Sequence, residues 1–256
     1  MFSLFLSLQV FAQAPLEPSE KNIHNQQNWF TYFGQYKLGE KWGIHADVQF
    51  RMDEDVKFAK QNLLRAGLIR YLNPQLNLTA GYAYINSHNA GLNAYATEHR
   101  IWEQVIFNHR PANLNMTHRL RLEHRFVEQL RLHMDGSVSP GSTKYGNRIR
   151  YFNRTILDLT RKPEAKNVVY FALQDEIFLN VAAPALNSNV FDQNRFLAAV
   201  GVFHDKKTRL ELGYMNQFLT PYRQANAMNH ILHVSVLQTL DFSGNKPKTP
   251  VQETIN

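Results

Sequence analysis

Residues 42–51 read WGIHADVQFR, and their alternation decides the fold class. Apolar side chains occupy every second position from Trp42 to Phe50, and small or polar residues fill the positions between them. Successive side chains of a β-strand point to opposite faces, so the segment predicts a strand with one apolar and one wetter face. The same rhythm returns about ten times, and its last repeat covers residues 229–242.

Alternating segments of about ten residues, separated by turns, are typical of transmembrane β-barrels. The pattern predicts strands near residues 28–37, 42–52, 61–72, 76–87, 98–109, 114–128, 146–160, 167–180, 194–204, 208–219 and 229–242. The connections between them alternate between short ones (38–41, 73–75, 110–113, 161–166 and 205–207) and longer ones (53–60, 88–97, 129–145, 181–193 and 220–228). Outer-membrane barrels have short periplasmic turns and long extracellular loops. The longest connection, 129–145, is long enough to fold over or into the mouth of such a barrel.

We therefore expect an all-β fold, an antiparallel transmembrane β-barrel of 10–12 strands. Bacterial barrels of one chain usually have an even number of strands. Twelve strands are favoured, with the additional strand inside residues 15–27, and ten is the next choice.

Composition narrows the class of protein further. The chain has 256 residues and no cysteine, which excludes thiolate catalysis, cysteine metal sites and a lipid anchor on cysteine. No run of about 18 apolar residues occurs beyond the N-terminus, which argues against a helical membrane protein. The net charge is +7, but the basic residues form no runs, so nucleic acid is not an expected partner.

The chain is expected to divide into four parts. Residues 1–14, MFSLFLSLQVFAQA, read as a secretory signal peptide that lacks its basic start, which points to a truncated start. Residues 15–27 form a polar linker, 28–242 the barrel, and 243–256 a polar tail. Phe242 ends the last alternating strand and resembles the signal that the barrel-assembly machinery reads. The expected location is the outer membrane of a Gram-negative bacterium, with outer-membrane lipids and that machinery as partners; the oligomeric state is left open.

Charged residues on the predicted inward faces form the candidate site. An Arg that faced lipid at the bilayer midplane would cost about 2–4 kcal/mol, so these side chains are expected to point into the lumen. The predicted lumen network consists of Asp47, Arg51, Arg65, Arg119, Arg121, Glu123, Arg125, Arg148, Arg150, Arg154, Glu176, Arg209 and Glu211. Two interpretations share this geometry. The network either closes the lumen as a structural salt-bridge cluster or forms a basic constriction that selects anions.

Other functions find less support in the residues. A lipid-modifying barrel enzyme would need a Ser–His contact at one rim, and His133, Ser137, Ser139 and Ser142 are the nearest candidates. A soluble, periplasmic, lipocalin-like binder is the third alternative, and connection lengths would separate it from a membrane barrel. The 11 histidines are scattered without metal-site spacing, so no metal, cofactor or catalytic residue is expected.

Several strand blocks resemble one family. They are the Trp42 strand after KLGEK, NLLRAGL from Asn62, EHRIWEQ from Glu98, RLRLEHRF from Arg119 and QDEIFLN from Gln174. Over residues 28–242 the chain resembles the DUF2490 family of uncharacterised bacterial outer-membrane barrels. The resemblance implies a barrel fold and no particular activity.

Overall fold

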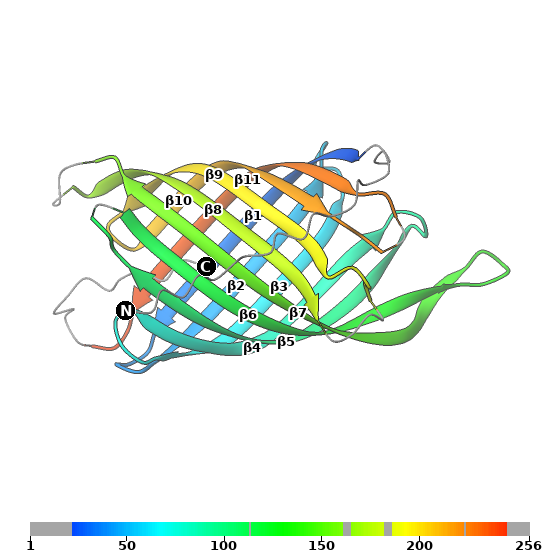
Figure 1. Cartoon of the computed structure of the whole chain (residues 1–256), viewed down its shortest axis with the longest axis horizontal. Coiled ribbons are helices and arrows are strands. Elements are labelled where there is room, and N and C mark those ends of the chain that lie inside the picture. The colour runs from blue at the N-terminus through cyan, green and yellow to red at the C-terminus, as the bar shows by residue number, and fades with distance from the viewer. Residues whose placement is uncertain (1–21, 113, 161–164, 182–185, 223, 245–256) are drawn as a thin grey trace, which may run out of the picture.

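Eleven β-strands close into a barrel in the computed structural model, which describes residues 22–112, 114–160, 165–181, 186–222 and 224–244. The strands are β1 (Ile23–Lys37), β2 (Trp42–Asp53), β3 (Ala59–Tyr71), β4 (Leu76–Asn89), β5 (Ala94–His109), β6 (Leu114–Leu132), β7 (Val138–Asp158), β8 (Asn167–Val181), β9 (Phe191–His204), β10 (Thr208–Leu219) and β11 (Ala227–Asp241). Each pairs with its neighbours in chain order and runs inclined to the long axis of the barrel (Figure 1). No helix among the described residues is long and apolar enough to cross a membrane.

Eleven strands lie within the expected range of 10–12, but the favoured number of twelve is wrong, and the barrel closes through a parallel pair where a wholly antiparallel ring was expected. β1 and β11 pair without a register break from Ile23↔Ala227 to Lys37↔Asp241, whereas all other neighbours are antiparallel. When an odd number of strands alternates in direction, the first and last run the same way, so their pairing must be parallel. Residues 23–27 extend β1 instead of forming a strand of their own. The expected signal peptide lies outside the described residues, as do residues 15–21.

Two rims follow from this topology. The turn rim carries the connections 38–41, 72–75, 110–113, 159–166 and 205–207, and the hairpin rim carries 54–58, 90–93, 133–137, 182–190 and 220–226. The difference in length between the connections of the two rims is smaller than predicted, because strands continue into the segments that were expected to be loops. β6 and β7 pair as far as Leu132↔Val138 and project beyond the barrel as a hairpin, so they do not fold over its mouth (Figure 1).

Tight turns at the turn rim have clear local causes. The side-chain oxygen of Asn73 accepts hydrogen bonds from the backbone N–H groups of Gln75 and Leu76, both at 2.9 Å, which is the Asx-turn chemistry of such residues. Between β9 and β10, Asp205 and Lys206 have φ values of 49° and 54°. Positive φ at two successive turn residues gives the hairpin twist that matches the flanking strands.

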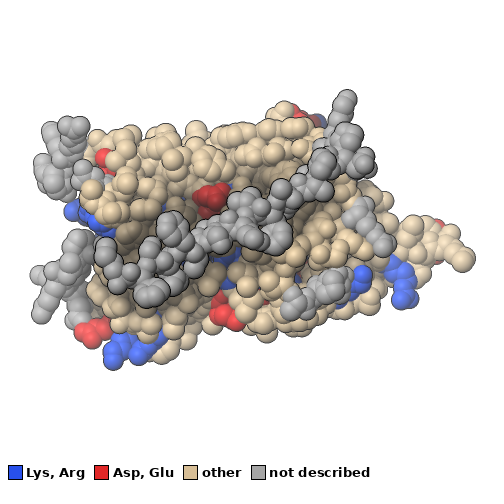
Figure 2. All heavy atoms as spheres, in the orientation of Figure 1, with Lys and Arg blue, Asp and Glu red and all other residues tan. Residues whose placement is uncertain are grey.

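The two faces of the barrel wall have opposite polarity. Along β5, buried and exposed residues alternate from Glu98 to Phe107. The outer face exposes large apolar side chains, for example Leu120 at 54% and Leu212 at 58%. The inner face buries charged ones, and Asp47 and Glu123 are both 0% exposed. Figure 2 shows the consequence on one flank, where few charged side chains interrupt a largely uncharged surface.

Near the middle of the described strands, two carboxylates depart from this division. By strand alternation, Glu103 on β5 and Asp175 on β8 point outward. Glu103 lies 3.5 Å from His124 Nε2, and Asp175 accepts a hydrogen bond of 2.8 Å from Asn194. Both acidic groups therefore have a polar neighbour on the otherwise apolar outer face.

Apolar side chains narrow the lumen at two places. Trp102 is fully buried against the wall where Gly67 and Gly81 leave room, since a Cβ on either glycine would lie 2.8 Å from the indole ring. Near the turn rim, a second group packs together inside the barrel. This turn-rim cluster consists of Ile156, Tyr170, Ala172 and Leu237, with Phe33 and Phe203 packed against it.

Candidate functional site: an arginine-rich lumen

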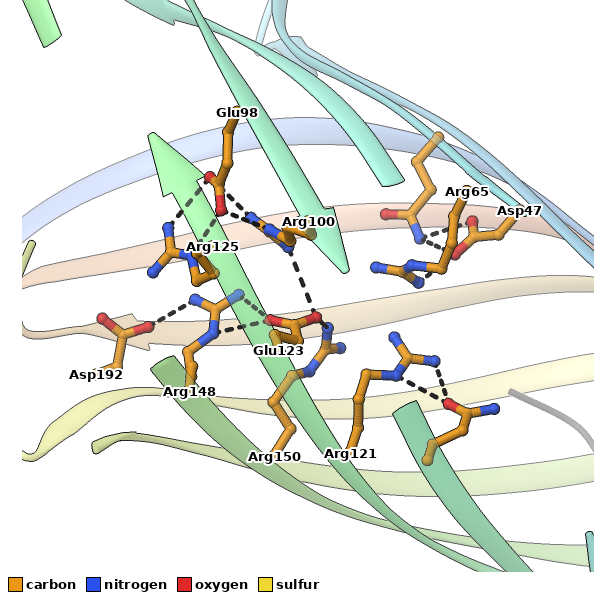
Figure 3. Close-up of polar contacts among 12 residues, drawn as sticks. Asp47, Arg65, Glu98, Arg100, Arg121, Glu123, Arg125, Arg148, Arg150 and Asp192 are labelled. Atoms are coloured by element: carbon orange, nitrogen blue, oxygen red, sulfur yellow. Dashed lines mark hydrogen bonds and ion pairs between the residues drawn. The ribbon is translucent and has the colours of Figure 1, made fainter. Parts of the chain in front are cut away.

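All thirteen residues of the predicted lumen network lie on inward faces of the strands. Eleven of them are buried, with exposed fractions from 0% for Asp47 and Glu123 to 9% for Arg51. Arg125 and Arg209 are partly buried on the same inner face. Figure 3 shows how the side chains from neighbouring and distant strands point toward one another inside the barrel.

Glu123 on β6 is the most densely paired carboxylate. One oxygen accepts hydrogen bonds from Arg148 Nε (3.0 Å) and Nη2 (2.7 Å), and the other accepts one from Arg150 Nη1 at 2.6 Å. Arg100 Nη1 lies 3.7 Å from that second oxygen. Three guanidinium groups thus surround one carboxylate, a geometry that holds their planes in fixed orientations (Figure 3).

Other ion pairs cross the lumen between strands that are not neighbours. Arg119 on β6 contacts Glu176 on β8 at 2.6 Å, and Arg154 on β7 contacts Glu211 on β10. Since one arginine side chain suffices to reach a second or third strand along, the interior is narrow at this level. These pairs therefore fill the lumen as well as balance its charges.

Glu98 shows the same bidentate chemistry closer to the hairpin rim. Its two oxygens accept hydrogen bonds of 2.5 and 3.0 Å from Arg100 and of 2.6 and 3.1 Å from Arg125. On β7, Arg148 bonds Asp192 at 2.8 Å with the nitrogen that Glu123 does not use.

Positive charge is in excess along the lumen. Eleven arginines point inward: Arg51, Arg65, Arg100, Arg119, Arg121, Arg125, Arg148, Arg150, Arg154, Arg195 and Arg209. Six carboxylates lie among them: Asp47, Glu98, Glu123, Glu176, Asp192 and Glu211. Within the described chain, Arg51, Arg121 and Arg195 form no ion pair. Their hydrogen bonds go to amide oxygens, namely those of Gln49 and Gln61, of Gln104, and of Gln193.

Sequence reasoning did not single out Glu98, Arg100, Asp192 and Arg195 as members of this network. Glu98 and Arg100 occupy alternate positions on the inward face of β5, as the predicted residues do on their strands, so strand alternation alone could have identified them. Asp192 is the unpaired residue at an irregularity between β8 and β9, where the register shifts and simple alternation fails.

Two cavities lie in the lumen, one above the other along the barrel. The larger, which we call the vestibule, lies toward the hairpin rim and has a volume of about 300 Å³. The smaller, the inner chamber, has a volume of about 50 Å³ and reaches Phe33 and Leu237 of the turn-rim cluster. Both cavities are lined by Gln49, Arg65, Arg150 and Arg195, which therefore form the partition between them.

The protruding hairpin brings together two residues named for the enzyme alternative. His133 Nε2 lies 2.7 Å from Ser139 Oγ. Asp135 does not orient that histidine, because it accepts hydrogen bonds from the hydroxyl and backbone N–H of Ser137, which lower the pKa of its carboxyl. In the part of the chain that the structure describes, His133 has no carboxylate partner, and no group of three or more acidic, His or Cys residues could hold a metal ion.

Phe242 lies directly after β11 and is 62% exposed. Its ring stacks against Tyr36 with 6.5 Å between centroids, and its N–H donates to Lys37 O at 2.8 Å. The side chain is thus held at the turn rim, beside the parallel closing pair.

Comparison with known proteins identifies a family without assigning an activity. No curated protein matches the chain. A solved structure titled "NanC porin structure in rhombohedral crystal form" has 10% sequence identity and a TM-score of 0.42, and the match covers 79% of this chain and 92% of that one. The model of the family described as "Protein of unknown function (DUF2490)" matches residues 26–228, and the chain belongs to that family.

Proposed function

We propose that this protein is an outer-membrane β-barrel of a Gram-negative bacterium that admits small anions into a largely closed lumen. The observation that carries the proposal is the polarity of the wall, apolar outside and charged inside. A water-soluble barrel buries its apolar face, whereas a barrel in lipid exposes that face and keeps polar side chains in the lumen. This polarity also disfavours the lipocalin-like alternative, whose interior would be the apolar side.

Side chains near the rims fit the boundaries of a bilayer. Trp42 at the turn rim is 46% exposed, and the guanidinium of Arg70 lies 4.7 Å from its ring centre. Phe58 and Tyr95 are exposed at the hairpin rim. Aromatic girdles of this kind flank the apolar band of outer-membrane barrels, and Arg beside an aromatic ring can reach the headgroups.

The contents of the lumen support restricted passage. A solute that entered the vestibule would meet the partition, then a chamber of about 50 Å³, then the apolar turn-rim cluster. Eleven inward arginines against six carboxylates favour anions over cations at each charged level. The conductance of the barrel is therefore expected to be small and selective for anions.

Two experiments test the proposal. Membrane fractionation with a heat-modifiability gel reports location and barrel closure together, and a folded chain that is soluble without detergent would contradict the membrane assignment. Planar bilayers then measure conductance and reversal potential. The double variant Arg150→Ala/Arg195→Ala removes two partition side chains and should raise the conductance. A large, cation-selective conductance in the unmodified protein would refute both the closure and the charge assignment.

A lipid-hydrolase function is a second candidate, because the Ser139–His133 distance of 2.7 Å fits nucleophilic catalysis. The test is release of fatty acid from phospholipid vesicles by the purified barrel. Fatty-acid release that disappears in Ser139→Ala would favour the hydrolase. Release no greater than from protein-free vesicles would refute it, and the Ser139–His133 contact would then be a hydrogen bond within the hairpin.

A further inference from the structure

The vestibule is more basic than the inner chamber, whose wall contains five arginines and two carboxylates. Its wall contains seven arginines and two carboxylates, Glu98 and Asp192. Five of those arginines, including Arg65, already form ion pairs with carboxylates. The remaining two are Arg51 on β2 and Arg195 on β9, and neither forms an ion pair among the described residues.

Arg51 and Arg195 are held in place by an aromatic ring instead of a carboxylate. Both guanidinium groups approach the ring of Trp29 on β1, Arg51 at 3.9 Å and Arg195 at 5.0 Å from its centre. Arg51 also donates to the side-chain oxygens of Gln61 (2.5 Å) and Gln49 (2.6 Å). Stacking and amide hydrogen bonds fix the orientation of a guanidinium plane but place no carboxylate in ion-pair contact with its charge, which is uncompensated in that sense.

Burying an uncompensated charge is costly, and the buried Nε atoms of Arg51 and Arg195 have no hydrogen-bond partner. An anion would relieve that cost, and the planar fork of arginine matches the two oxygens of a carboxylate or phosphate. The vestibule, at about 300 Å³, is as large as ordinary small-molecule pockets of about 300–1,000 Å³. Space, charge and donor geometry therefore coincide at one place.

We propose that the vestibule is a binding site for a small organic anion, in which Arg51 and Arg195 hold a carboxylate or phosphate group of the ligand. The inference deepens the proposed function and rests on it, since it specifies what the anion-admitting lumen retains. The neutral side chains Ser87, Gln193 and Gln217 also line the vestibule and supply hydrogen bonds to the remainder of such a solute.

The test measures binding to the folded full-length barrel in non-ionic detergent, by calorimetry and by tryptophan fluorescence at constant ionic strength. Inorganic phosphate and citrate are the two probes, and chloride is the competing ion. The probe that binds more tightly shows whether the site prefers a phosphate or a carboxylate group. Saturable binding is expected for at least one probe, with a change in emission that is lost in Trp29→Phe. Arg51→Gln and Arg195→Gln should each weaken binding about ten- to hundred-fold, the effect of one lost charge-assisted contact.

Arg121→Gln is the matched control. Arg121 is also buried, also bonded to a glutamine and also stacked on a tryptophan, 4.7 Å from the ring centre of Trp102, but it lines neither cavity. The affinity of the Arg121→Gln variant for phosphate and citrate should equal that of the unmodified protein. Should a glutamine variant fail to fold, Arg51→Lys keeps the charge, loses the planar fork and should still weaken binding.

Absence of saturable binding for both probes, or an equal loss in Arg121→Gln, would overturn the site. The outcome is separable from that of the proposed function, because binding is measured without a membrane. A barrel that binds phosphate or citrate but conducts no anions would keep the site and refute passage. One that conducts anions without saturable binding would refute the site alone.

Discussion

Replacing Glu123 by glutamine tests whether the lumen is a desolvated ion network or a set of hydrated charges. The side chain is 0% exposed, and its two oxygens serve Arg148 and Arg150 separately. An amide keeps one acceptor oxygen and turns its NH₂ donors toward the other guanidinium. The guanidinium that meets the amide loses this contact and faces NH₂ donors, although Arg148 keeps Asp192 and Arg150 keeps Glu176 as second carboxylate partners. The expected cost therefore lies at the lower end of the range of about 3–5 kcal/mol for breaking a buried pair from one side. We expect the free energy of unfolding to fall by that amount.

Equilibrium unfolding in urea from lipid vesicles, followed by tryptophan fluorescence, measures the change. Glu103→Gln is the control, because Glu103 lies on the adjacent strand, points outward, and its side chain is 50% exposed with one ion-pair neighbour, His124 Nε2 at 3.5 Å. Because Glu103 faces lipid, where a charged group is unfavourable, its neutralisation should not lower the free energy of unfolding. If both variants cost the same small amount, water screens the lumen charges and the closed-lumen reasoning fails.

Three further predictions concern the outer wall and the closing pair. Leu120→Arg places a charge on the apolar face and should weaken folding into vesicles by about 2–4 kcal/mol if the residue lies near the midplane; an effect smaller than that of Arg121→Leu, measured in the same assay, would reverse the assigned faces. Glu103→Leu removes a carboxylate from the lipid-facing surface and should raise the urea midpoint of unfolding. A lowered midpoint would show that the contact of Glu103 with His124 stabilises the barrel more than exposure of the carboxylate to lipid destabilises it. Phe242→Ala should slow assembly in cells, read as less heat-modifiable protein in the membrane fraction, and unchanged yield would remove Phe242 from the recognition signal.

Strand positions could be predicted because each strand has one face in a medium of different polarity. The alternation of β2 or of residues 98–107 in β5 is a direct record of that difference. The record fades where both faces are polar. Residues 23–27, IHNQQ, and the outer part of β7, VSPGSTKY from Val138, carry no regular apolar alternation, so the sequence predicted both strands to begin too late.

Strand number and pairing partners depend on features that alternation does not encode. Whether the ring closes with eleven or twelve strands is decided by the pairing of β1 with β11, whose partners lie about 200 residues apart, as Ile23 and Ala227 do. The Arg119–Glu176 and Arg154–Glu211 pairs each join residues 57 positions apart on strands that are not neighbours. Such contacts follow from barrel register and width, which only the closed structure fixes.

The excess of arginine is difficult to explain by stability alone. Buried ion pairs contribute little net stability, and apolar residues of similar volume often serve a fold as well or better. A lumen built only to be closed would need no arginine without a carboxylate, yet Arg51, Arg121 and Arg195 bond amides while six carboxylates serve the other arginines. Arg51 and Arg195 both line the vestibule, and Arg195 is also part of the partition. A solute that enters from the hairpin rim would reach these two arginines before the inner chamber. An anion-binding lumen needs arginines without carboxylate partners at that position, whereas a lumen that is only structural does not.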